Sequence, residues 1–259
     1  MRIVSYNILN GGEGRADPLA EVLLAQRPDI VVLVEADDPG ALDRISARLD
    51  MDCIHGPGNR HASAILSRWP IRESINLALL HPEISRSLLQ ATIVDPAGGE
   101  WTIGAVHLQA HATEAAESRR EAELQVLLRI FEPIRSAGRP HLIAGDFNAN
   151  APSQKIDPAL CEPRTREAWE KSGGRVPRRA VQKMLDAGYL DTLFEAAPNE
   201  APTTGTFSTQ FPGQRVDYIF AHGIGKDQIR SAWVERDRLA KYASDHFPIG
   251  VEIQTGGQR

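Results

Sequence analysis

Apolar residues along this chain fall into two kinds of pattern. Short, nearly uninterrupted runs such as Ile30–Val34 are typical of strands buried on both faces. Longer segments such as Asp38–Leu49 repeat their apolar residues every three or four positions, as one face of a helix does. Both kinds occur in both halves of the chain, without a linker, a repeat or a low-complexity segment between them. The pattern therefore predicts a single domain, residues 1–259, of the α/β class with a largely covered sheet core.

The runs and their flanking turn residues give the expected boundaries of the elements. Strands are expected at Arg2–Ile8, Ile30–Val34, Ala62–Leu66, Leu88–Val94, Trp101–Leu108, His141–Ala144, Arg215–Phe220, Trp233–Val234 and Ile249–Ile253. Helices are expected at Asp17–Gln26, Asp38–Leu49, Glu114–Ile130 and Val181–Gly188, with a further helix starting at Asp191. Asp17 is the expected N-cap of the first helix, with Pro18 at its first position. In the longest helix, Leu124 and Leu127 belong to the apolar stripe, and Glu117–Glu123 is expected to be its solvated part.

The segment His141–Asn150, HLIAGDFNAN, is the one around which the other polar residues are interpreted. Gly145 ends its apolar run, and Asp146 and Asn148 follow two positions apart. In extended backbone these two side chains project to the same side, with Phe147 pointing back into the core. A carboxylate beside a carboxamide suits a hard cation, an oriented water or a phosphate oxygen. The alternative is an Asx turn that merely closes the strand.

Other polar residues also stand at or near the ends of apolar runs, and each has a structural alternative. Asn7 can simply start a turn, Glu35 can be solvated in the following loop, and His107 can be a satisfied structural group. Together with the central segment they form one series along the chain: Asn7, Glu35, His107, Asp146 with Asn148, Asp217, and Asp245-His246.

Composition narrows the class of protein. The chain has 259 residues, 42% of them hydrophobic, which is enough for one large core. No apolar stretch approaches the roughly 20 residues needed to span a bilayer, and the start lacks a signal-peptide pattern. Cys53 and Cys161 have no metal-ligand or disulfide-framework spacing, so reduced thiols in a cytoplasmic protein are expected. The protein is also expected to be a monomer. The net charge of −5 excludes a generally basic nucleic-acid-binding surface but allows a locally basic cleft.

A basic tract follows the central segment. Residues 160–183 hold seven basic residues against three acidic ones, a local charge of 7 − 3 = +4. The tract is either a solvated helix with a flexible loop at Gly173-Gly174 or a rim that faces substrate phosphates. In the second interpretation, the phosphate-binding candidates are Arg175, Arg178 and Arg179.

The order and chemistry of these motifs resemble the endonuclease/exonuclease/phosphatase superfamily, which includes deoxyribonuclease I and exonuclease III. The matching strings extend from residue 5 to residue 249: SYNILN, VVLVEA, AILSRWPI, AVHLQ, HLIAGDFNA, RVDYIF and SDHFPI. The resemblance implies a four-layer α/β/β/α sandwich, in which two mixed sheets pack face to face with helices outside. It also implies hydrolysis of phosphate esters with one or two Mg²⁺ or Mn²⁺ ions.

The resemblance further implies a role for each residue of the series. Asp146 and Asn148 would orient the attacking water and contact phosphate, while Asp217 would fix the tautomer of His246, a base or phosphate ligand. His107 would donate to phosphate or protonate the leaving group. The implied site comprises metal ligands Asn7, Glu35 and Asp245, catalytic residues His107, Asp146, Asn148, Asp217 and His246, and phosphate-binding Arg86.

Departures from the family pattern bear on the substrate. Val34 stands where the family usually has Gln before its glutamate. The chain lacks the longer signature of abasic-site endonucleases and the Trp-Cys-Asp-Arg string of inositol-polyphosphate 5-phosphatases, which argues against both activities. The first hypothesis is a metal-dependent phosphodiesterase that cleaves DNA or RNA, and the alternative is hydrolysis of a small phosphoester or a phospholipid head group. A non-catalytic binding module ranks last, because every expected site residue is present.

Overall fold

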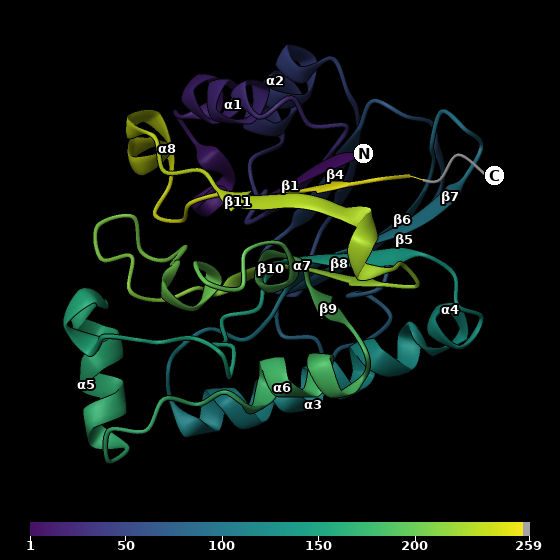
Figure 1. Cartoon of the computed structure of the whole chain (residues 1–259). Helices are drawn as coiled ribbons and strands as arrows, with labels where there is room; N and C mark the ends of the chain where they lie inside the picture. Colours follow the sequence, from purple (N-terminus) through teal and green to yellow (C-terminus); the bar gives the residue numbers. More distant parts are fainter. Residues whose placement is uncertain (256–259) are drawn as a thin grey trace.

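The computed structural model describes residues 1–255, and its elements form four layers (Figure 1). Two mixed six-stranded sheets pack face to face, and helices cover the outer face of each sheet. This is the four-layer α/β/β/α sandwich that the family resemblance implies. Among residues 1–255, none of the helices combines the length and the apolar composition that a membrane crossing requires.

The first sheet contains the first and the last strand of the chain and has the strand order β11-β12-β1-β2-β4-β3. Its central strand β1 pairs in parallel with β2 and antiparallel with β12. Helices α1, α2 and α8 cover its outer face (Figure 1). The bounds are β1 Arg2–Asn7, β2 Ile30–Val34, β3 Asp52–Gly56, β4 Ser63–Ser67, β11 Ile229–Val234, β12 Ile249–Ile253, α1 Ala16–Ala25, α2 Pro39–Leu49 and α8 Arg238–Ala243.

The second sheet has the order β5-β6-β7-β8-β10-β9, with β7 and β8 parallel at its centre. Helices α3 and α6 pack against its outer face, and α7 lies against β10 and β11. The bounds are β5 Ile71–Asn76, β6 Ser87–Val94, β7 Glu100–His107, β8 His141–Asp146, β9 Leu190–Asp191, β10 Asp217–His222, α3 Glu114–Ile130, α4 Glu132–Ser136, α5 Pro163–Lys171, α6 Arg179–Asp186 and α7 Thr192–Ala196.

The hydrophobic core has three layers, one between the two sheets and one between each sheet and its helices. The central layer is formed by inward-facing residues of both sheets, for example Val32 and Val251 against Ile103 and Ala144. The outer layers join each sheet to its helices. Because β2 is buried on both faces, its sequence is a continuous apolar run rather than an alternating one.

The structure corrects two expectations about helices. Asp17 does not cap α1, which starts at Ala16; its carboxylate instead accepts from the Arg44 guanidinium of α2 at 2.6 and 2.5 Å. The segment Glu117–Glu123 of α3 is not its solvated part, because Glu117, Arg120 and Glu123 are buried. These three polar residues face the protein because they bind one another or the backbone of neighbouring loops.

Several short elements were not expected from the sequence. Strands β3 and β5 have few buried apolar residues, and α8 is only six residues long. Strand β11 starts at Ile229, well before the expected Trp233. Edge elements of this kind carry weak periodicity, since only one of their neighbours buries them.

Candidate active site

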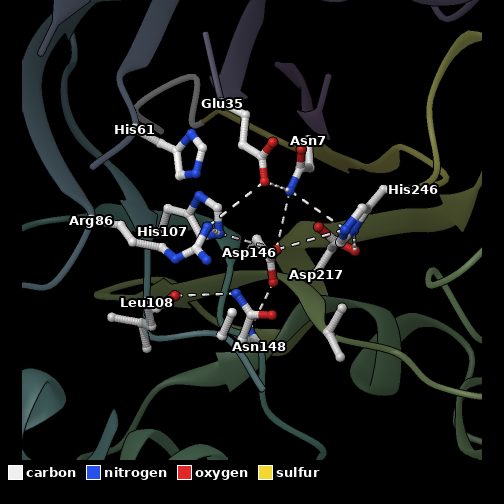
Figure 2. A network of polar contacts seen from close by, with 12 residues as sticks. Asn7, Glu35, His61, Arg86, His107, Leu108, Asp146, Asn148, Asp217 and His246 are labelled. Atoms are coloured by element: carbon white, nitrogen blue, oxygen red, sulfur yellow. Dashed lines mark hydrogen bonds and ion pairs between the residues drawn. The ribbon is translucent and has the colours of Figure 1, made fainter. Parts of the chain in front are cut away.

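Strand order brings the polar residues of the series to one edge of the two sheets. The parallel pair β1 and β2 ends at Asn7 and Val34, directly before Glu35, and the parallel pair β7 and β8 ends at His107 and Asp146. Asp217 starts β10 opposite Asp146, because these two strands are antiparallel. The segment before β12 carries His246 to the same edge, beside Asp217 and Asp146 (Figure 2). Asp245 directly precedes His246.

Asp146 reaches this edge because Gly145 precedes it. At Gly145, where φ is +142°, a Cβ atom would lie 1.9 Å from the carbonyl oxygen of Val106 on β7. Only glycine therefore lets β8 pair with β7 up to Asp146. The next residue, Phe147, is buried and packs edge-on against Phe220 and Tyr218, as the sequence predicts.

Asn148 is positioned by a turn rather than by continued strand. Its φ is +50°, and its backbone N–H donates to Asp146 Oδ1 at 2.8 Å, which is the Asx turn that the sequence allowed. Its side-chain amide donates to the Leu108 carbonyl at 3.1 Å. The turn and the polar cluster are thus parts of one arrangement, since the turn holds the Asp146 carboxylate in place.

Asp217 and His246 form a buried carboxylate–imidazole pair. His246 Nδ1 lies 2.8 Å from Asp217 Oδ2, and His246 Nε2 lies 3.8 Å from Asp146 Oδ2 (Figure 2). Burial alone would lower the pKa of His246, but the negative charges of Asp217 and Asp146 raise it above its ordinary value. Burial, and then the charge of Asp217, raises the pKa of Asp146.

Asn7 links the two sheets within the cluster. Its side-chain nitrogen donates to Asp146 Oδ2 at 3.1 Å and to Glu35 Oε1 at 3.3 Å, and lies 3.4 Å from His246 Nε2. Its side-chain oxygen accepts from the Leu9 N–H at 3.0 Å. Asn7 therefore contributes a hydrogen-bond donor to the cluster. Its side-chain oxygen, the atom that would bind a metal ion, already accepts a hydrogen bond from the Leu9 backbone.

Glu35 and Asp245 have the chemistry of a hard-cation site. Glu35 has a positive φ of 57°, and its Oε2 accepts from the Asn10 N–H at 2.9 Å, so it is held in the cluster rather than solvated. Asp245 Oδ1 is buried without a hydrogen-bond partner among the described residues. Burial, with a further contribution from Glu35, raises the pKa of Asp245. A divalent ion fits this arrangement, because it would neutralise both carboxylates and give the unpartnered oxygen a ligand.

A second set of atoms also satisfies the spacing for a metal. One ligand atom each from Asp146, Asp217 and His246 lies within 4.8 Å of the others. However, Asp217 and His246 already use their facing atoms in a mutual hydrogen bond.

Arg86 and His107 occupy the opposite side of the cluster from His246 (Figure 2). Arg86 Nη1 lies 3.0 Å from His107 Nε2 and 3.8 Å from Glu35 Oε1, while His107 Nε2 lies 3.4 Å from Asp146 Oδ2. Burial, and then the positive charge of Arg86, lowers the pKa of His107 well below its ordinary value. His107 is accordingly neutral, with Nε2 available to accept from the guanidinium.

The basic tract is divided between two locations. Arg178 donates to the Ala151 carbonyl, and Arg179 pairs with Glu121 at 2.9 Å and with Glu114 at 3.0 Å on α3. These two arginines and exposed Arg175 line a cavity against α3 that none of the predicted catalytic or metal residues lines. Arg164 of α5, by contrast, lines a cavity of about 230 Å³ together with Asn148 and Phe207. The sequence showed the charge of the tract but not which arginine faces the site.

Sequence reasoning also missed a histidine beside the cluster. His61 lies in the loop before β4, and its ring stacks on that of His107 with centroids 5.7 Å apart. Its Nδ1 lies 2.7 Å from Asp37 Oδ2. The available signal was Asp37 itself, a carboxylate two positions after Glu35 in the same loop.

Comparison with known proteins identifies the family of the chain. The model of the Endonuclease/Exonuclease/phosphatase family matches residues 4–246. No curated protein matches the chain in sequence.

Solved structures share the fold at low sequence identity. An AP endonuclease from Archaeoglobus fulgidus superimposes with a TM-score of 0.71 at 20% identity, over 98% of this chain and 100% of that one. A 3′ phosphatase, NExo from Neisseria bound to a product DNA hairpin, gives a TM-score of 0.72 at 21% identity, over 98% and 100%. A humanized TDP2 from D. rerio gives a TM-score of 0.70 at 20% identity, over 98% and 99%.

Proposed function

The chain belongs to the Endonuclease/Exonuclease/phosphatase family, and we propose that it is a divalent-metal-dependent phosphodiesterase that cleaves nucleic acid as a single catalytic domain. Members of this family are hydrolases that act on phosphoester bonds. The observation that carries the proposal is the Asp217–His246 pair, 2.8 Å long and buried, directed at the Asp146 carboxylate. This geometry supplies a proton acceptor and an oriented imidazole at one point.

Glu35 and Asp245 would hold Mg²⁺ or Mn²⁺, with Asn7 orienting Glu35 through its amide nitrogen. When bound, such an ion offsets the phosphate charge and polarises a phosphoryl oxygen. A single ion would be bound by the carboxylates of Glu35 and Asp245. Asp146 and Asn148 remain the candidates for a second ion.

Asp146 takes the proton of the attacking water in this mechanism. The water oxygen bonds to phosphorus as the bond to the leaving oxygen breaks, and the leaving oxygen takes a proton from solvent. A carboxylate with a raised pKa is a better base than an exposed one, and the Asn148 N–H holds one of its oxygens at 2.8 Å. His246, held cationic by Asp217, donates to a phosphate oxygen that gains charge as the water attacks.

His107 supports this reaction without acting as an acid. Its lowered pKa keeps the imidazole neutral, which disfavours proton donation to the leaving group. Its hydrogen bond with Arg86 instead fixes a guanidinium beside Glu35 and Asp146, where it can contact phosphate.

A nucleic-acid substrate is supported by Arg164 and Phe207, which line the 230 Å³ cavity beside Asn148. A cation and an aromatic ring are the groups that bind phosphates and bases. The DNA hairpin bound by the similar Neisseria phosphatase gives a precedent for such a substrate. A second candidate, a small phosphoester, is favoured by the pairing of Arg179 with two glutamates of α3, which leaves this predicted phosphate-binding residue away from the catalytic cluster.

A substrate panel tests the proposal. Plasmid DNA, oligoribonucleotides, bis-p-nitrophenyl phosphate, inositol phosphates and sphingomyelin are each assayed with Mg²⁺, Mn²⁺ and EDTA. We expect EDTA-sensitive hydrolysis of the nucleic acids and of the synthetic diester. Asp146→Asn should lower the rate by about 10²- to 10⁴-fold.

Asp52→Asn is the matched control, since Asp52 is exposed at the opposite end of the first sheet from the cluster. Activity that resists EDTA, or that survives Asp146→Asn, contradicts the proposed mechanism. Hydrolysis confined to inositol phosphates or sphingomyelin supports the small-phosphoester alternative.

A further inference from the structure

Beside the buried Asp217–His246 pair the site edge carries a second carboxylate–imidazole pair, Asp37 with His61. Asp37 Oδ2 lies 2.7 Å from His61 Nδ1, and Asp37 Oδ1 accepts from the Ala62 N–H at 2.7 Å. The carboxylate thus fixes both the ring and the backbone of the loop that carries it. Since Nδ1 is engaged, Nε2 is the ring nitrogen available to a ligand.

The pair lies next to the groups that face phosphate in the proposed mechanism. The His61 ring stacks on His107 at an interplanar angle of 24°, and His107 in turn bonds Arg86 (Figure 2). His107 is 1% exposed, whereas the His61 side chain is 24% exposed. His61 is therefore the member of this stack that solvent, or a substrate extending out of the site, can reach.

Hydrogen-bond donors gather on one side of the cluster. Arg86 lies there with the His107 and His61 rings, and the carboxylates on that side are Glu35, 3.8 Å from Arg86, and Asp37, which is bound to His61 Nδ1 and to a backbone N–H of the same loop. Arg86 Nε is buried without a partner among residues 1–255, and an unpaired buried donor costs about 1–3 kcal/mol. The Arg86 side thus has more donor capacity than its protein contacts use.

We propose that the Asp37–His61 pair, with Arg86, forms a subsite for a second phosphate of the substrate, adjacent to the phosphate that is hydrolysed. With a proton on each ring nitrogen, His61 donates from Nδ1 to the Asp37 carboxylate and from Nε2 to an anionic oxygen of that second phosphate. The inference deepens the proposed function and rests on it, because it assigns a polyphosphorylated strand rather than an isolated diester as the preferred substrate.

Four substrates test the subsite: bis-p-nitrophenyl phosphate, the dinucleoside monophosphate TpT, and TpT with an added phosphate at its 5′ or its 3′ end. His61→Ala should lower kcat/KM about tenfold for a terminally phosphorylated dinucleotide, chiefly through KM, as expected for one lost charge-assisted hydrogen bond. The same variant should leave TpT and the synthetic diester within about twofold. Whether His61→Ala affects the substrate with the 5′ phosphate or the one with the 3′ phosphate shows on which side of the scissile bond the subsite lies.

Two further variants separate binding from folding and from general charge. Asp37→Asn keeps the oxygen that accepts from Ala62 and leaves His61 in place, so it should show a smaller loss with the same substrate selectivity. Arg60→Ala removes a full positive charge from the exposed neighbouring residue and should not change the selectivity. Equal losses on all four substrates, or an effect of Arg60→Ala as large as that of His61→Ala, would overturn the subsite.

Binding of thymidine 3′,5′-bisphosphate and of the two thymidine monophosphates, measured calorimetrically with Mg²⁺, tests the same inference without turnover. The wild-type protein should bind the bisphosphate more tightly than either monophosphate, and His61→Ala should remove that preference. Absence of hydrolysis from all four substrates would contradict the proposed function, whereas an unchanged preference in His61→Ala would contradict the subsite.

Discussion

At the scale of single residues, the catalytic proposal depends on two buried imidazoles in different charged surroundings. Burial lowers the pKa of both, but Asp217 and Asp146 raise that of His246, whereas Arg86 lowers that of His107 further. The Asn148 N–H holds Asp146. Two imidazoles a few ångströms from the same carboxylate therefore have opposite charge states. The difference arises from their second contacts, a carboxylate for one and a guanidinium for the other.

The Asp217–His246 pair should behave as one unit. His246→Ala is expected to lower kcat by about 10²- to 10⁴-fold, and Asp217→Asn should cost most of that loss because the imidazole is no longer oriented. The double variant should then differ from His246→Ala by less than about 0.5 kcal/mol in activation free energy. A double-mutant cycle on kcat measures this; additive losses would mean that the two side chains act separately.

Glu35 should set the affinity for the divalent ion. Glu35→Gln removes a charge from the proposed ligand set and should raise the Mg²⁺ concentration for half-maximal activity about 10- to 100-fold, with the fold intact. Titration with Mg²⁺, by activity and by calorimetry, provides the measurement. Glu13→Gln, at an exposed position of the loop after β1, is the control. An unchanged titration in Glu35→Gln removes this residue from the metal site.

At the scale of elements, the buried polar face of α3 supports the ends of two strands. Glu123 Oε1 accepts from the Ser85 N–H at 2.7 Å and its Oε2 from the Gln109 N–H at 2.9 Å. Ser85 precedes Arg86, and Gln109 follows His107 and Leu108. One carboxylate on a helix thus connects the segments that carry two proposed phosphate-facing residues.

Glu123→Gln is therefore expected to affect both folding and activity. Its amide N–H₂ would face one of the two backbone donors, which should cost about 1–3 kcal/mol in the free energy of unfolding. At a temperature where the variant is fully folded, kcat for the synthetic diester should still fall, because Arg86 and His107 lose their common support. Glu121→Gln, on the exposed face of the same helix, should change stability by less than about 1 kcal/mol and leave kcat unchanged. Normal kcat in folded Glu123→Gln would limit this residue to a role in stability.

The arginines of the basic tract should differ in their effect on DNA binding according to the element that each one faces. Arg164→Ala, at the cavity beside Asn148, should raise KM for DNA and reduce the slope of log KM against log salt by about 0.9 if one phosphate contact is lost. Arg179→Ala, whose side chain pairs with α3, should change that slope little. Kinetics between low and moderate salt distinguish them. If only Arg179→Ala, or the triple change of Arg175, Arg178 and Arg179, flattens the salt dependence, the originally predicted arginines bind the substrate.

At the scale of the whole molecule, stability should depend on pH through a buried histidine remote from the site. His141, at the start of β8, has Nδ1 2.8 Å from the Arg139 carbonyl oxygen and Nε2 2.8 Å from the Tyr189 hydroxyl. Burial lowers its pKa to about 4. The unfolded chain therefore binds an additional proton between about pH 4 and pH 6.5, and unfolding is favoured as pH falls through that range.

The expected loss is about 2–3 kcal/mol in the free energy of unfolding between pH 6.5 and pH 4. Denaturant unfolding at a series of pH values measures it, and His141→Gln should give a flatter curve over this window. His81→Gln, at a partly exposed position of the loop after β5, is the control. A slope in His141→Gln equal to that of the wild type would assign the acid sensitivity to other groups.

The sequence by itself determined the central strands and the chemical identity of the polar residues at their ends. Ile30–Val34 was predicted to the residue, because a strand buried on both faces needs a continuous apolar run. Ile249–Ile253 was also predicted to the residue, although Glu252 interrupts its apolar residues. Glycine before Asp146 and the Asx-type turn after it are also local requirements, and each can be recognised within a few positions.

Only the tertiary structure decided which of these residues meet and which polar residues are buried. Face-to-face packing of the two sheets, with β1 against β8, brings Asn7 near Asp146, 139 positions away. The burial of Glu117, Arg120 and Glu123, the division between Arg164 and Arg179, and the Asp37–His61 pair likewise depend on partners from distant segments. The periodicity of a segment indicates which of its faces is apolar, but the partner of a polar side chain is set by sheet order and loop packing.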